Sequence, residues 1–121
     1  MPDIIFYRDD DGHVPVLEWF EGLSQKARLA CIARIELLKA HGHQLRRPHA
    51  DYLRDDIYEL RARHRGVNYR LLYFFHGQGV VVLSHGILKQ RATVPPIDIE
   101  RARRRKQAFY ASPERHTHKE T

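Results

Sequence analysis

A small set of side chains in the second half of the chain has the chemistry needed to cleave RNA. Arg61, Arg70 and Lys89 are cationic. His85 titrates near neutral pH, and Glu59 lies close to Arg61 in the sequence. Cleavage by the neighbouring 2′-hydroxyl needs a proton acceptor, cationic donors for the crowded phosphate and a proton donor for the leaving 5′-oxygen. Arginine suits the phosphate, because its planar guanidinium binds two oxygens at once, and Lys89 or His85 suits a proton transfer.

The stretch 57–75 must position the two arginines. Its sequence, IYELRARHRGVNYRLLYFF, predicts two antiparallel strands joined by a basic turn over residues 63–67. Side chains alternate between the two faces of a strand, so Tyr58 and Leu60 point away from Arg61. We expect the Tyr- and Leu-rich faces to pack on helices. Arg61 and Arg70 would then emerge together on the opposite face as surface groups.

Residues 80–88 predict a third strand, after a turn at residues 77–79. The residues of one parity are Val81, Leu83, His85, Ile87 and Lys89. Both faces are mostly apolar, as in a central strand, and polar groups appear only towards its end. We therefore expect the chemistry at that end.

The remaining segments predict one α+β domain over residues 1–110. A first strand at residues 4–7 precedes a helix at residues 16–23 and a second helix that Ser24 caps and His41-Gly42 ends. These two helices are expected to cover a small, mostly antiparallel sheet, and a final helix begins near Ile97. Residues 51–56 are interpreted as a lead into the hairpin. Residues 111–121 are expected to be a flexible polar tail.

The net charge of +6 is unevenly distributed. Residues 1–23 carry six acidic and one basic side chain, whereas the rest of the chain is basic. This asymmetry favours a polyanionic partner, most often nucleic acid. The side chains expected to contact RNA outside the catalytic set are Arg46, Arg47, Arg63, Arg65 and Arg91. The basic run at residues 101–106 is either a solvated helix face or a phosphate contact.

The composition disfavours several other classes of protein. Cys31 is the single cysteine and lies in an apolar helical pattern, which indicates packing and provides no disulfide framework. His41, His43 and His49 lack a carboxylate or thiol that would complete a ligand set, so neither a metal nor another cofactor is expected. The start of the chain lacks the pattern of a signal peptide and no apolar run is long enough to cross a bilayer, so we expect a cytoplasmic protein.

Three motifs at hairpin spacing resemble the HigB branch, of phage-derived type, in the RelE/ParE toxin superfamily. They are Glu59-Leu60-Arg61, Tyr69-Arg70 and His85-Gly86-Ile87-Leu88-Lys89, and the likeness extends from residue 17 into the final helix. The resemblance implies a RelE-like fold and the toxin of a type II toxin-antitoxin system. Such toxins cleave messenger RNA on the ribosome and are neutralised by a helix-turn-helix antitoxin. By motif, Arg61, Arg70 and Lys89 become the implied catalytic positions.

The sequence also departs from the family pattern and leaves alternatives open. The family commonly continues the strand-end lysine with a second lysine and a threonine, whereas Gln90 and Arg91 stand here, so Arg91 is expected to supply the missing charge. A pair of acids, Asp55-Asp56, precedes the hairpin and is expected beside the RNA face. The alternatives are a ParE-like inhibitor of DNA gyrase and a non-catalytic basic nucleic-acid-binding module. His85 is alternatively a hydrogen-bonded sheet residue.

Overall fold

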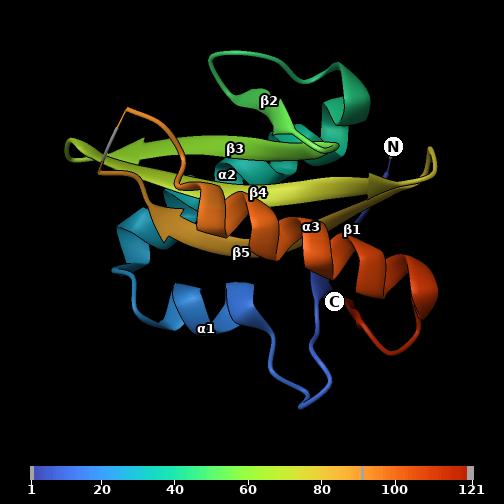
Figure 1. Ribbon diagram of the computed structural model, residues 1–121. Helices are drawn as coiled ribbons and strands as arrows, with labels where there is room; N and C mark the ends of the chain where they lie inside the picture. The colour runs from blue at the N-terminus through green and yellow to red at the C-terminus, as the bar shows by residue number, and fades with distance from the viewer. Residues whose placement is uncertain (1, 91, 120–121) are drawn as a thin grey trace.

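The described residues fold around a six-stranded sheet. The computed structural model describes residues 2–90 and 92–119, and the strand order across the sheet is β2-β3-β4-β5-β1-β6 (Figure 1). Neighbouring strands are antiparallel, except that β1 and β5 are parallel. The strands are β1 (Asp3–Tyr7), β2 (Ala50–Arg54), β3 (Ile57–His64), β4 (Val67–His76), β5 (Val80–Leu88) and β6 (Thr117–Lys119).

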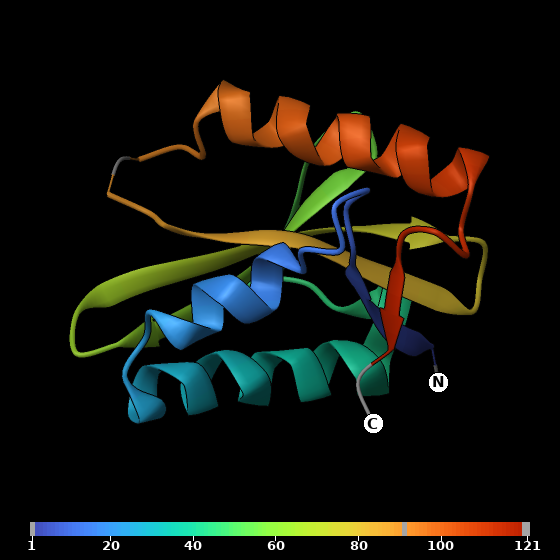
Figure 2. The same cartoon turned by 90° about the horizontal axis from the view of Figure 1, so that it is seen from below.

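Three α-helices in the described part of the chain cover the two faces of this sheet. Helices α1 (Pro15–Glu21) and α2 (Gln25–His41) pack on one face, and α3 (Pro96–Ala111) packs on the other, as Figure 2 shows. Ser24 caps α2 by accepting a hydrogen bond from the backbone of Ala27, and a short 3₁₀ turn, η1 (Gly42–Gln44), follows it. This confirms the predicted α+β architecture and is consistent with a RelE-like fold. We refer to the two surfaces of the sheet as the α1–α2 face and the α3 face.

The alternation of the hairpin strands assigns each side chain to a face as predicted. Leu60 and Leu71 lie in the core on the α1–α2 face, whereas Leu72 and Phe74 lie in the core on the α3 face. The turn between β3 and β4 is tighter than predicted, because only Arg65 and Gly66 lie between the strands, both with positive φ. Two such residues match the type I′ turn that fits the twist of paired strands.

A β-bulge in β5 changes the face of the sheet on which the last residues of the strand lie. Tyr73 pairs with Leu83 but Leu72 pairs with His85, so Ser84 is an extra residue. The prediction that Val81, Leu83, His85 and Ile87 share a face was therefore wrong, because one inserted residue reverses the faces beyond it. Val81 and Leu83 lie on the α1–α2 face, whereas Ile87 lies on the α3 face.

The residue after His85 shows how closely α1 approaches the sheet at this point. A Cβ placed on Gly86 would lie 2.3 Å from two ring atoms of Trp19. Only glycine leaves room for the indole at that distance. The glycine in the third motif therefore has a packing role between β5 and α1.

The segment 51–56 contains a strand that the sequence analysis missed. β2 pairs with β3 through Tyr52 and Tyr58, and the Asp55-Asp56 turn joins these strands. This turn lies at one end of β3 and the Arg65-Gly66 turn lies at the other. Eight residues of extended chain separate the ends, roughly 25 Å. The two acids predicted beside the RNA face therefore lie at the end of β3 remote from the basic turn.

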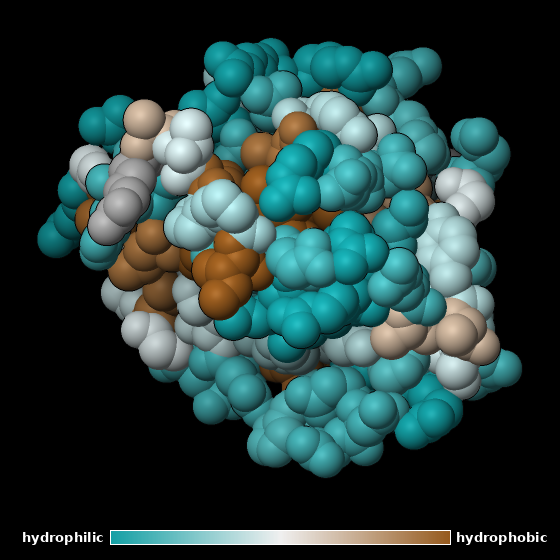
Figure 3. Space-filling view, in the orientation of Figure 1, coloured by the Kyte–Doolittle hydropathy of each residue, from teal (hydrophilic) through white to brown (hydrophobic). Residues whose placement is uncertain are grey.

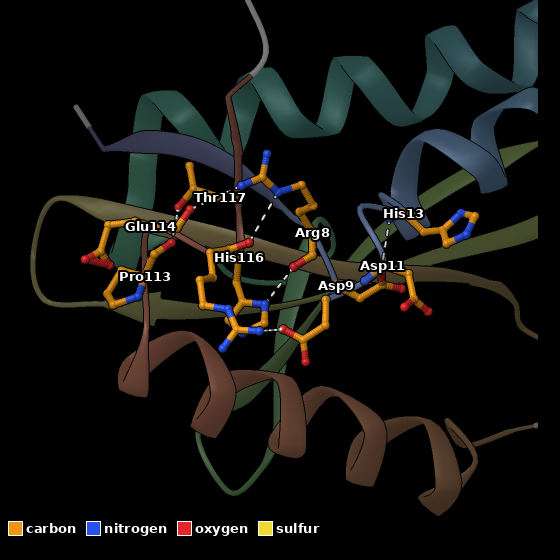
Figure 4. A network of polar contacts seen from close by, with 10 residues as sticks. Arg8, Asp9, Asp11, His13, Pro113, Glu114, His116 and Thr117 are labelled. Carbon is orange, nitrogen blue, oxygen red and sulfur yellow. Dashed lines mark hydrogen bonds and ion pairs between the residues drawn. The ribbon is translucent and has the colours of Figure 1, made fainter.

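The predicted flexible tail contains a strand in its described part. β6 pairs with β1, and His116 is buried, with its ring stacked on Tyr7 at a centroid distance of 5.0 Å. Figure 4 shows Arg8 reaching this segment, where its guanidinium donates to the backbone oxygens of Glu114 and Arg115. The prediction of an unstructured tail missed these contacts, because they depend on pairing with the first strand of the chain.

No helix in the described part of the chain is long and apolar enough to span a bilayer.

Candidate functional site

The register of β3, β4 and β5 arranges the predicted site residues in three rows across the sheet. The first row contains Glu59, Leu72 and His85, and the second contains Arg61, Arg70 and Ile87. In the third row Arg63 pairs with Asn68, whose backbone oxygen accepts a hydrogen bond of 2.8 Å from the backbone of Lys89. The three sequence motifs therefore converge at the end of the sheet that lies near the Arg65-Gly66 turn.

Arg70 occupies the centre of this arrangement and is buried. Its side chain is 4% exposed, and its Nε donates to Oε1 of Glu59 at 2.9 Å. A second guanidinium nitrogen donates to the backbone oxygen of Tyr69. Burial lowers the pKa of Arg70, and the carboxylate of Glu59 opposes that effect. The prediction that Arg70 is a surface group was wrong, because Glu59 on the same sheet face holds it in a buried ion pair.

Arg61 lies next to this ion pair, and its guanidinium makes no hydrogen bond or ion pair with the described residues. Its backbone is fixed, since its N–H donates to His49 and its oxygen accepts from Arg34. The side chain is partly exposed. Among the described residues, none forms a hydrogen bond or an ion pair with its guanidinium. The guanidinium of Arg61 is thus available to an external anion.

Lys89 and Arg63 extend this positive surface along the third row. The backbone of Lys89 is fixed by Asn68, and two strand spacings, roughly 10 Å, separate it from Arg63. Neither side chain has a hydrogen-bond or ion-pair partner among the described residues. We call Arg61, Arg63 and Lys89 the open cations.

His85 is buried on the α3 side of the sheet and both ring nitrogens are engaged. Nδ1 lies 2.8 Å from Oγ of Ser84, and Nε2 lies 3.2 Å from Oδ1 of Asp98 in the first turn of α3. Burial lowers the pKa of His85 to about 4, and the charge of Arg105 adds to this effect. The imidazole is therefore neutral at pH 7 and links β5 to α3. This geometry fits the alternative interpretation of a hydrogen-bonded sheet residue.

The other predicted RNA contacts differ in their availability. Arg47 is exposed and pairs with Asp51, with a guanidinium nitrogen 2.7 Å from the carboxylate; the hydrogen bond from Arg47 lowers the pKa of Asp51. Arg46 is exposed and donates to backbone oxygens of His43 and Leu45. Arg65 is exposed in the hairpin turn. Arg91 lies outside the described residues.

The basic run of α3 is mostly neutralised by its own neighbours. Arg101 pairs with Asp98 and Arg103 pairs with Glu100, each three residues earlier in the helix. Lys106 reaches Asp56 of the β2–β3 turn at 3.4 Å. Arg105 donates to the backbone oxygen of Ser84 and lies 5.4 Å from the centre of the Tyr7 ring. These contacts favour a structural role for most of the run.

Figure 3 shows the surface on the α3 side of the sheet. It is largely hydrophilic, with hydrophobic residues gathered towards the side where β5 ends and the chain leads into α3. Leu88 and Ile97 are among the most exposed large apolar residues of the chain. The open cations therefore adjoin an apolar surface.

Two acidic residues of this region were missed or undervalued by the sequence analysis. Asp51 lies opposite Glu59 in the β2–β3 pairing, and Asp98 holds both His85 and Arg101. The spacing of three between Asp98 and Arg101 in a predicted helix is a signal that could have identified that pair. Among the described residues, no group of three or more histidine, cysteine, aspartate or glutamate side chains is placed to hold a metal ion.

Comparison with known proteins identifies the family of the chain. The model of the family described as "Phage derived protein Gp49-like (DUF891)" matches residues 18–107. This match covers α2, most of α3, the hairpin and all three site motifs. A search of curated proteins found no match. The match spans most of the 121 residues, and the chain therefore belongs to the phage-derived Gp49-like family.

Proposed function

We propose that this protein is a HigB-like toxin of a type II toxin-antitoxin system that cleaves messenger RNA on the ribosome. The observation that carries the proposal is the group of open cations beside the buried Glu59–Arg70 pair. The family match and the resemblance of the three motifs to the RelE/ParE superfamily support the same assignment. The proposed partners are the ribosome, messenger RNA and a helix-turn-helix antitoxin.

In the proposed reaction the RNA 2′-hydroxyl loses its proton to solvent water, its oxygen bonds to the adjacent phosphorus, and the bond from phosphorus to the 5′-oxygen breaks. The products are a 2′,3′-cyclic phosphate and a 5′-hydroxyl end. Arg61 contacts the phosphate and stabilises the added negative charge, for which a guanidinium is suited. Lys89 donates the proton that the leaving 5′-oxygen takes up.

Arg70 acts in this proposal as a positioning residue. Glu59 holds its guanidinium inside the sheet, where it lies opposite Arg61 in the pairing of β3 and β4. The charge of Arg61 lowers the pKa of Arg70, after the larger effect of burial. Because Glu59 binds Arg70 and the row of Arg61, Arg70 and Ile87 contains no acid, the guanidinium of Arg61 can bind the substrate phosphate.

The test uses ribosomes translating a defined messenger RNA, with primer extension to locate new 5′ ends. The intact protein is expected to cut within translated codons and leave 5′-hydroxyl ends. Arg61→Ala is expected to lower the cleavage rate about 100- to 1000-fold, the usual effect of removing one charge-stabilising donor. Lys89→Ala should lower it as well. Arg104→Ala removes an exposed arginine from α3 and serves as the matched control.

A non-catalytic RNA-binding module is the second candidate function. The burial of Arg70 and the neutral, engaged state of His85 favour it, because both groups are withdrawn from substrate. This candidate predicts retention of RNA without new ends. Cleavage that proceeds equally in the Arg61→Ala and control variants, or no cleavage by the intact protein, would refute the nuclease proposal.

A further inference from the structure

A cavity of about 610 Å³ opens on the α1–α2 face, across the sheet from Arg61. Its apolar lining comes from three elements: Ile4 and Phe6 of β1, Leu17 and Phe20 of α1, and Ile32 and Ile35 of α2. Each helix contributes a pair three residues apart, which lies on one side of that helix. We call this cavity the groove.

The rim of the groove is mainly acidic in a chain whose net charge is +6. Asp3, Glu21 and Glu36 line it, and all three are exposed. None of these carboxylates has an ion-pair partner within 4 Å among the described residues. Of the two cations on the rim, Arg28 donates to the backbone oxygens of Phe20 and Leu23, which leaves Lys39 as the cation free of such contacts in the described chain.

The charge and shape of the groove restrict what can occupy it. Nucleic acid and anionic lipid carry the same sign of charge as the rim and would be repelled. An amphipathic helix enters a groove of this type with apolar side chains at positions i, i+3 or i+4, and i+7. Basic residues flanking such a stripe would meet Asp3, Glu21 and Glu36.

We propose that the groove binds an amphipathic helix of a partner protein whose apolar stripe is flanked by lysine or arginine. This assignment gives a role to Asp3 and Glu21, two of the six acids in the first 23 residues, which the RNA proposal leaves without one. It does not depend on the nuclease proposal. The groove lies on the α1–α2 face, whereas Arg61 lies in a row with Ile87 on the α3 face, so the two sites can be occupied together.

The test compares two synthetic amphipathic peptides that share one leucine stripe and differ only in their flanks, all lysine in one and all glutamate in the other. Binding is measured by anisotropy of labelled peptide and by the emission of Trp19, the single tryptophan, whose ring lies 5.8 Å from that of Phe20. The lysine peptide is expected to bind about tenfold or more tightly at low salt. Added salt should reduce this difference, because exposed charges are screened.

Variants of the protein locate the binding. Glu36→Lys should weaken the lysine peptide several-fold and strengthen the glutamate peptide. Asp11→Lys changes the net charge equally at an exposed position outside the groove lining, and it should leave both affinities unchanged. Ile32→Asp places a charge in the apolar lining and should abolish binding, with circular dichroism used to verify that the variant is folded.

Four outcomes would overturn the proposal. Equal binding of the two peptides would remove the charge argument, and no binding of either would remove the site. An effect of Asp11→Lys equal to that of Glu36→Lys would show attraction to the whole chain. Sedimentation that detects self-association abolished by Glu36→Lys would assign the groove to a second copy of the chain.

Discussion

Two arginine-rich regions of this protein, the open cations and the basic run of α3, differ in how their charges are balanced. In α3, acids three residues before Arg101 and Arg103 pair with them along the helix. On the sheet, Glu59 binds Arg70 and the adjacent Arg61 has no acid within 4 Å among the described residues. The run with the higher density of arginine in the sequence is therefore the less available to an anion.

The ion pairs of the two regions also differ in how much they contribute to stability. The Arg103–Glu100 pair of α3 is partly exposed to water, where such contacts contribute little to stability. The Glu59–Arg70 pair is almost fully buried, and each charge there depends on the other for solvation. Loss of one partner should therefore have very different effects in the two regions.

The largest expected effect follows from removing Glu59. Glu59→Ala leaves the guanidinium of Arg70 buried without its carboxylate, which typically costs about 3–5 kcal/mol of unfolding free energy. Urea unfolding measures this loss. Replacing both residues, as in Glu59→Leu with Arg70→Met, should recover most of it, because an apolar pair of similar volume avoids the buried charge.

The matched control is Glu100→Ala in the exposed pair of α3, which should leave the urea midpoint nearly unchanged. A loss in Glu59→Ala no greater than that in Glu100→Ala would show that Arg70 is well solvated without Glu59. Removing one partner from the buried pair would then cost no more unfolding free energy than removing one from the pair in α3.

A smaller, pH-dependent effect is expected from His85, which connects the two regions through Asp98. Its pKa is lowered to about 4 in the folded protein, whereas an unfolded chain takes up the proton near pH 6.5. Between these values the unfolded state binds more protons, so stability falls as the pH falls from about 6.5 to about 4. The full contribution is on the order of 3 kcal/mol.

Unfolding measured at several pH values in the intact protein and in His85→Gln tests this expectation. The difference in unfolding free energy between the two proteins should shrink as the pH falls through this window, because only the intact protein carries the penalty. Carboxylates with lowered pKa values, such as Asp51 and Glu100, are present in both and cancel. A pH-independent difference would mean that His85 titrates alike in both states.

Local patterns predicted those elements whose signals lie within a few adjacent residues. The alternation in residues 57–75 placed Arg61 and Arg70 on one face, and the Ser24 cap and Gly42 stop located α2. By contrast, β6 has the polar sequence Thr117-His118-Lys119 and exists through pairing with β1. β2 was missed for a similar reason, since residues 51–56 contain four charges and little alternation.

The sequence predicted where the candidate residues lie along the sheet, but not the burial of Arg70 or the protonation of His85. Whether Arg70 is free depends on its diagonal contact with Glu59, which requires the exact register of β3 and β4. The face of His85 depends on the bulge at Ser84, and no residue in that apolar run marks an insertion. The burial of Arg70 and the face occupied by His85 therefore depend on the register of the strands, which the amino-acid composition does not determine.

The smallest expected effect concerns the salt dependence of RNA binding, and it tests the availability of each charge directly. Each cation that neutralises a phosphate of a single strand contributes about 0.7 to the slope of log affinity against log salt. Arg61→Ala and Lys89→Ala should therefore each lower the slope by about 0.7. Arg103→Ala should not change it, because Glu100 already binds that guanidinium. Filter binding of a short single-stranded RNA across a salt series measures the slopes. An equal reduction in all three variants would show that RNA competes successfully with the α3 ion pairs, and the basic run would then belong to the RNA-binding surface.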